Sequence, residues 1–201
     1  MIGIYGGTFD PVHNGHLIIA TEIFNITSLE KIIVIPTRTP PHKDGKVSAN
    51  FEKRFEWTKT AFDGLEKIEI SDFENSANPS YTIDTIRHFQ NKYGKVAYIM
   101  GEDSFVNIEK WYKYEEILNL ARLYVYPRYC DRSFTITLIK RFKNYDVHFL
   151  SEMPVIQISS TAIRERAQSG LSIRGYVPDK LEKDILEFYQ QIGNQKKNSD
   201  Q

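Results

Sequence analysis

The sequence predicts an α/β protein with a doubly wound parallel sheet and a small C-terminal helical portion. Short apolar runs, several of them rich in β-branched residues, alternate with segments whose apolar residues recur at helical spacing. The runs are apolar throughout, which is typical of parallel strands that helices cover on both faces. We expect six strands, at residues 2–5, 32–35, 68–70, 96–100, 123–126 and 147–150.

Helices are expected between these strands and after the last of them. Apolar residues recur at helical spacing over residues 17–24, 83–93 and 117–121. A further helix is expected from about Thr161, and the residues from Asp179 open a last helix with a capping-box pattern. We expect one domain over residues 1–190 and a disordered polar tail over residues 191–201.

Composition and charge exclude several classes of protein. The chain has 201 residues, with 26 basic and 26 acidic side chains. A neutral balance argues against a nucleic-acid coat or a basic membrane-surface protein. Cys130 is the only cysteine, so an intrachain disulfide and a Cys-rich zinc site are excluded. No signal-peptide pattern and no apolar stretch of about 18 residues occurs. We therefore expect a cytoplasmic protein with neither a membrane nor a nucleic-acid partner.

The loop after the first strand carries the most informative motif. In a doubly wound sheet, ligands bind beyond the carboxyl ends of the strands. This loop reads Gly6-Gly7-Thr8-Phe9-Asp10-Pro11-Val12-His13-Asn14-Gly15-His16. Paired glycines let the backbone approach a ligand closely. His13 and His16 share one face of a helix start, where phosphate is favoured, and Gly15 leaves room for a bulky group between them. Two imidazoles there can stabilise transition-state charge.

Other interpretations of this loop are less consistent with its residues. A tight turn with two surface histidines is one alternative. A zinc site is another, but no Cys or carboxylate stands nearby at a supporting spacing. The loop fits neither G-x-x-x-x-G-K-[ST] nor G-x-G-x-x-G, so P-loop enzymes and dinucleotide-binding dehydrogenases are excluded.

A second motif, far along the chain, has the same anion-binding chemistry. It reads Ile158-Ser159-Ser160-Thr161-Ala162-Ile163-Arg164. Hydroxyls and amides at a helix N-terminus, with a guanidinium one turn later, form an anion cradle. Alone, Ser159 to Thr161 also fits an ordinary N-cap. Together, the two motifs resemble the signature of the HxGH nucleotidyltransferases. The resemblance implies a Rossmann-like nucleotidyltransferase fold and transfer of a nucleotidyl group from a triphosphate, with pyrophosphate released.

Three further segments narrow the resemblance. They are Pro40-Pro41-His42-Lys43, Pro79-Ser80-Tyr81-Thr82-Ile83-Asp84-Thr85, and Gly101-Glu102-Asp103-Ser104 followed by Trp111. Taken singly, they fit a proline-rich surface loop, a helix cap, and an aromatic residue of the core or rim. Together they resemble the corresponding segments of bacterial nicotinate-nucleotide adenylyltransferases, and the likeness extends from residue 2 to about residue 189.

The resemblance implies adenylyl transfer from ATP to nicotinate mononucleotide, giving deamido-NAD and pyrophosphate for NAD biosynthesis. Transfer to another phosphorylated acceptor, such as nicotinamide mononucleotide or phosphopantetheine, remains an alternative. A catalytically inactive nucleotide-binding regulator is another. Mg²⁺ is expected to arrive with ATP rather than in a metal site of the protein. The sequence leaves a homo-oligomer open.

The resemblance also assigns site residues. The chemistry is assigned to His13, His16, Lys43 and Arg164. ATP binding is assigned to Gly7, Thr8, Phe9, Gly15, Gly101, Asp103, Ile158, Ser159, Ser160 and Thr161. Binding of nicotinate mononucleotide is assigned to Ser80, Tyr81, Thr82 and Trp111. Two positions depart from the family pattern: Glu102 adds a negative charge beside the expected nucleotide site, and Gly175 stands where an aromatic residue is expected.

Overall fold

The structure is a computed structural model that describes residues 1–39, 48–76, 79–128 and 133–199. Its centre is a sheet of six parallel strands in the order β3-β2-β1-β4-β5-β6. The strands are β1 (Ile2–Gly7), β2 (Lys31–Pro36), β3 (Ile68–Ile70), β4 (Val96–Gly101), β5 (Arg122–Tyr126) and β6 (Val147–Phe149). The order reverses between β1 and β4, as in a doubly wound sheet. This confirms the predicted fold class, and every strand begins within one residue of its expected start.

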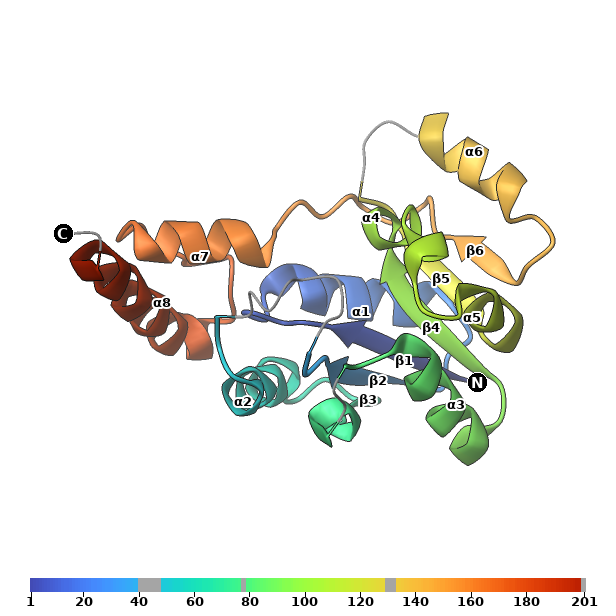
Figure 1. Cartoon of the computed structure of the whole chain (residues 1–201), viewed down its shortest axis with the longest axis horizontal. Coiled ribbons are helices and arrows are strands. Elements are labelled where there is room, and N and C mark those ends of the chain that lie inside the picture. Colours follow the sequence, from blue (N-terminus) through green and yellow to red (C-terminus); the bar gives the residue numbers. More distant parts are fainter. Residues whose placement is uncertain (40–47, 77–78, 129–132, 200–201) are drawn as a thin grey trace.

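Helices cover both faces of the sheet (Figure 1). They are α1 (Asn14–Ile26), α2 (Phe51–Phe62), α3 (Thr82–Tyr93), α4 (Glu102–Phe105), α5 (Tyr114–Leu120), α6 (Ser133–Arg141), α7 (Ser160–Gln168) and α8 (Asp179–Ser199), with short 3-10 turns η1 (Phe73–Ser76) and η2 (Ile108–Lys110). Of the α-helices, α2, α4 and α6 were not predicted. The buried face of α2 includes Arg54 and Thr58, which interrupt the apolar pattern.

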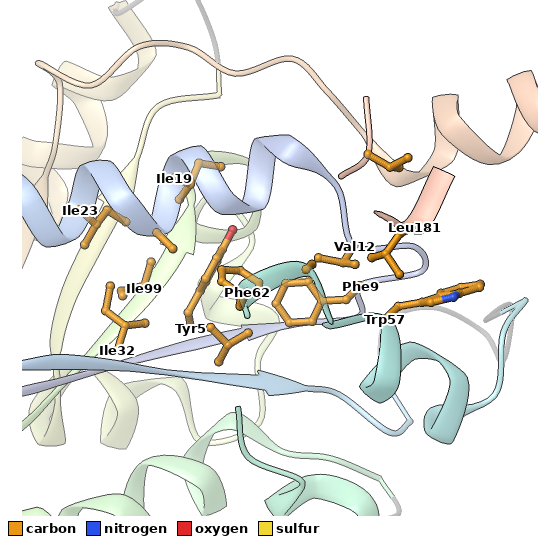
Figure 2. Packing of buried hydrophobic residues seen from close by; sticks show 14 of the residues in the cluster. Tyr5, Phe9, Val12, Ile19, Ile23, Ile32, Trp57, Phe62, Ile99 and Leu181 are labelled. Atoms are coloured by element: carbon orange, nitrogen blue, oxygen red, sulfur yellow. The ribbon is translucent and has the colours of Figure 1, made fainter. Parts of the chain in front are cut away.

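Alternate residues of the strands supply two separate cores. In β2, Ile32 and Val34 point to one face, and Ile33 and Ile35 to the other. The first core is closed by α1, α2 and α8, and the second by α3 and α5. Figure 2 shows part of the first core, where residues of α1 lie above β1 and Trp57 of α2 approaches Leu181 of α8. The two cores hold the carboxyl ends of β1, β2 and β4 in fixed positions.

The last two helices lie close together beyond the carboxyl end of β1 (Figure 1). Helix α8 extends to Ser199, whereas the sequence predicted a disordered tail from residue 191. Apolar contacts explain the difference, because Ile192 packs against the core that already includes Ile185 and Tyr189, and a side chain at Gly193 would approach Gln168 to 3.1 Å. Among the helices of the described residues, none has both the length and the apolar character needed to cross a membrane.

Candidate functional site

A cavity of about 880 Å³ opens at the carboxyl ends of the strands. It is lined by residues from both motifs and from the segments before α3 and after β4. The predicted site residues on its wall are Gly7, Thr8, Phe9, His13, His16, Ser80, Tyr81, Thr82, Asp103, Trp111, Ile158, Ser159, Ser160 and Thr161. Gly15, Gly101 and Arg164 are not among the residues that line the cavity, and Lys43 lies outside the described residues. The sequence therefore indicated about half of the residues that line the cavity, although it did not show how these residues contact one another.

The two histidines of the first motif form a stacked pair at the start of α1. Their ring centroids are 3.6 Å apart with an angle of 18° between the planes. The backbone N–H of His13 donates to Nδ1 of His16 at 3.1 Å, which places the proton of neutral His16 on Nε2. His13 is 4% exposed, and burial, helped by the nearby Arg128, lowers its pKa to about 3. The His13 ring is therefore neutral at neutral pH.

The structure shows what occupies the space beside Gly15. A Cβ atom there would stand 3.0 Å from Nδ1 of His13 and 3.0 Å from Cγ2 of Ile156. The space that the sequence assigned to a bulky ligand group is occupied by the His13 ring itself. Gly15 thus allows the histidine pair to pack tightly onto α1.

The second motif begins α7 and is joined to the first motif by direct hydrogen bonds. Ser159 caps the helix by accepting from the amide of Ala162 at 3.2 Å. The Ser160 hydroxyl donates to the carbonyl of Pro11 at 2.9 Å, and Nη1 of Arg164 donates to the carbonyl of Asp10 at 2.7 Å. Ser160 and Arg164, which were predicted to bind phosphate, therefore also hold the two motifs together.

Asp10 is a buried anchor whose role the sequence analysis missed. Its carboxylate accepts from the amides of Ser48 and Ala49 at 2.9 and 3.0 Å, and from the Tyr189 hydroxyl at 2.7 Å. Arg164 lies 3.8 Å from the same carboxylate. The Asp10 side chain thereby connects three parts of the chain: the segment before α2, helix α7 and helix α8.

Arg54 of α2 is a second buried anchor that the sequence analysis missed. Its side chain is 1% exposed, and it donates to the carbonyls of Thr8, Ala49, Thr37 and Arg38. Burial lowers its pKa, while the nearby Asp10 raises it. The guanidinium fixes the loops after β1 and β2 relative to each other, as its planar set of donors permits.

Asp103 and Arg128 form a charged pair on the cavity wall. Nε of Arg128 lies 3.6 Å from the Asp103 carboxylate, and its Nη1 donates to the carbonyl of Ile156 at 2.6 Å. Arg128 was not predicted as a site residue. Its position two residues after β5 could have indicated it, because ligands bind beyond the carboxyl ends of the strands. Gly101 packs behind this pair, because a Cβ atom there would stand 2.4 Å from Oδ1 of Asp103.

Glu102 does not place its charge in the cavity, contrary to the expectation from the sequence. Its side chain is buried, accepts from the Thr135 hydroxyl, and accepts from the backbone amide of Arg128 at 3.4 Å. This carboxylate connects α4, α6 and the segment after β5. The expected disturbance of a nucleotide site by Glu102 is therefore not supported. Gly175 adopts a φ of +78°, a conformation that an aromatic residue would rarely adopt.

The other end of the cavity is aromatic. The ring of Tyr81 lies 4.5 Å from that of Tyr112, and Tyr98 meets Trp111 edge-on at 6.3 Å. Tyr81 is the N-cap residue of α3, but its side chain makes no capping hydrogen bond. The first amides of this helix are therefore not satisfied by the Tyr81 side chain. Lys110 and Glu74 also line the cavity. Neither was predicted, because only the fold brings their segments to this edge.

The described residues contain no group of three or more His, Cys, Asp or Glu side chains placed to hold an ion. Within the described part of the chain, the stacked histidines therefore lack the further ligands that a zinc site needs.

Comparisons with known proteins place this arrangement in a family. Residues 4–166 match the model of the cytidylyltransferase-like family. A probable nicotinate-nucleotide adenylyltransferase of Thermotoga maritima is 44% identical over 190 residues, covering 94% of this chain and 92% of the relative. One from Thermotoga sp. strain RQ2 is also 44% identical, covering 94% and 96%.

A solved structure supports the fold. The nicotinic acid mononucleotide adenylyltransferase of Plasmodium falciparum, complexed with NaAD, is similar with a TM-score of 0.76 and 20% identity, covering 95% of each chain. The match to the family model and the identity to the curated relatives together show that this chain belongs to the nicotinate-nucleotide adenylyltransferases of the cytidylyltransferase-like family.

Proposed function

We propose that the protein transfers the adenylyl group of ATP to nicotinate mononucleotide, giving deamido-NAD and pyrophosphate. The observation that carries the proposal is the meeting of both motifs and the aromatic end in one cavity. One end offers donors for a triphosphate, and the other offers rings and helix amides for an acidic heteroaromatic group. Its volume of about 880 Å³ is at the upper range of ligand pockets, which suits two nucleotides.

The phosphate half comprises the histidine pair, Thr8 and the start of α7. Nε2–H of His16 is a donor, and His13 is a neutral, buried ring beside it. Arg128, which lines the same cavity, adds a positive charge near His13. We assign the α- and β-phosphates to the histidines and the adenosine ribose to Asp103, whose carboxylate can accept from ribose hydroxyls.

The acceptor half comprises Tyr81, Thr82, Lys110 and Trp111. Donors at the start of α3 suit a carboxylate, because amides and the helix dipole favour negative charge there. Trp111 offers a face on which the pyridine ring can stack. Lys110, which is exposed and lines this end, supplies a positive charge for the same carboxylate.

The reaction requires no protein nucleophile. A phosphate oxygen of nicotinate mononucleotide attacks the α-phosphorus of ATP, the new P–O bond forms, and the bond to the leaving pyrophosphate breaks. The attacking oxygen is already anionic, so no general base is needed. Mg²⁺ enters as part of the ATP substrate and neutralises phosphate charge. The chain contributes positioning and charge stabilisation by preorganised donors.

Pyrophosphate release from Mg²⁺-ATP tests the proposal. Purified protein is assayed with nicotinate mononucleotide, nicotinamide mononucleotide and 4′-phosphopantetheine. Fast release with the nicotinate acceptor alone is expected. Release only with another acceptor would retain the phosphate half and overturn the acceptor half, and ATP binding without any release would indicate a regulator.

A further inference from the structure

Glu74 is a buried carboxylate in the cavity wall that the proposed reaction does not use. It comes from η1, between β3 and α3, and is 5% exposed. Oε1 accepts from the Thr85 hydroxyl at 2.7 Å, whereas Oε2 is buried with no hydrogen-bond partner among the described residues. Such an unsatisfied carboxylate oxygen is costly and calls for an explanation.

The surroundings of Glu74 contain hydroxyls but no described cation. Burial raises its pKa, and the neighbouring hydroxyls of Thr85, Ser80 and Thr37 lower it. No Lys, Arg or His of the described chain is among the groups that shift this pKa. Within the described part of the protein, ionised Glu74 is therefore not paired with a side-chain cation.

Glu74 belongs to the aromatic end of the cavity. Its charge acts on Tyr98, whose hydroxyl is also hydrogen-bonded with Thr82. Tyr98 in turn meets Trp111 edge-on at 6.3 Å. The acceptor half thus combines several aromatic rings with one buried carboxylate, which is a chemistry suited to an organic cation.

The proposed acceptor contains such a cation. The ring nitrogen of a pyridine mononucleotide is bonded to ribose, so the oxidised ring is a positively charged pyridinium, whereas its 1,4-dihydro form is neutral. We propose that Glu74 is a specificity-determining residue that selects the cationic, oxidised pyridine ring of the acceptor. This inference rests on the proposed function.

The negative charge of Glu74 would act on the bound pyridine ring through the cavity wall rather than by direct contact. Glu74 is nearly fully buried, and attraction between charges is stronger in such surroundings than in water. A cation bound nearby would also favour the ionised carboxylate. A purely structural role, in which Glu74 only holds Thr85 and its neighbours, would affect charged and neutral acceptors alike.

The test compares two acceptors that differ in ring charge. We would measure kcat/KM for nicotinate mononucleotide and for its 1,4-dihydro form at saturating Mg²⁺-ATP. Glu74→Gln removes the charge and keeps an oxygen that can accept from Thr85. Glu109→Gln is the matched control, because Glu109 lies near Trp111 on η2 but is exposed, pairs with Arg141, and does not line the cavity.

Glu74→Gln should lower kcat/KM for the oxidised acceptor about tenfold or more, as expected for loss of one charge interaction in a site of intermediate dielectric. The reduced acceptor should change less than about twofold, and KM for ATP should stay constant, since Glu74 belongs to the acceptor half. The Glu109 variant should match the wild type with both acceptors.

Equal losses with both acceptors, or no loss, would overturn the inference and leave the proposed function intact. The wild-type protein gives a second test that does not depend on folding of a variant: similar kcat/KM values for the two acceptors would also contradict it. Absence of any turnover with nicotinate mononucleotide would instead overturn the proposed function, and this inference with it.

Discussion

The hydroxyl of Ser160 donates a hydrogen bond of 2.9 Å to the carbonyl of Pro11, across 149 residues of sequence. Arg164 makes a parallel connection to the carbonyl of Asp10. The two motifs are therefore one structural unit, in which α7 fixes the loop that carries the histidines. Changes in either motif should affect the position of the other.

Arg54 should be essential for stability although it does not line the cavity. Lysine at this position cannot serve four separate carbonyls, so Arg54→Lys leaves buried acceptors without partners. At roughly 1–3 kcal/mol for each unsatisfied group, the free energy of unfolding should fall by about 3 kcal/mol. Urea unfolding measures this. Arg141→Lys, at an exposed position, should stay within about 0.5 kcal/mol of the wild type.

Gly101 should affect ATP binding through Asp103. In Gly101→Ala the new Cβ would stand 2.4 Å from Oδ1 of Asp103, so the carboxylate must turn away. Loss of a charged hydrogen bond to the ribose should raise KM for ATP about tenfold or more. Steady-state kinetics test this, and in an Asp103→Ala background the Gly101 substitution should add little. Additive effects of the two substitutions would contradict this coupling.

Selectivity for the acidic acceptor should depend on Lys110. The wild type should use nicotinate mononucleotide with kcat/KM at least about a hundredfold above that for nicotinamide mononucleotide, because donors built for a carboxylate are mismatched by an amide. Lys110→Met should reduce this ratio by lowering the value for the nicotinate acceptor. Lys113→Met, at a lysine that pairs with Glu116 and does not line the cavity, should leave the ratio unchanged. A Lys110 variant with the wild-type ratio would exclude this role.

The buried His13 ring should make stability depend on pH. An unfolded imidazole takes up its proton near pH 6.5, whereas folded His13 does so only near pH 3. This contribution to stability is complete above pH 6.5 and is lost as the pH falls toward 3. Between pH 8 and pH 5 it should lower the free energy of unfolding by about 2 kcal/mol. Urea unfolding of the wild type and of His13→Asn measures this, and the variant should lose less stability over that interval.

Much of the fold could be predicted because parallel strands that are buried on both faces, such as β2 and β4, consist of nearly continuous apolar residues. Helix α2 was missed because its buried face includes Arg54, whose partners come from three loops. The cavity-lining motifs were evident from their residue types. Glu74 and Arg128 were not, because their proximity to the site depends on the strand order. The packing role of Gly15 likewise depends on Ile156, which is distant in sequence.

The account depends most on adenylyl transfer at the histidine pair. The most direct measurement follows deamido-NAD and pyrophosphate in the same reaction, from Mg²⁺-ATP and nicotinate mononucleotide, for the wild type and His16→Ala. We predict equal amounts of both products from the wild type, and a loss of both by a factor of about 10²–10³ in the variant, as for removal of one transition-state donor. Pyrophosphate without the dinucleotide, or a variant as fast as the wild type, would contradict the account.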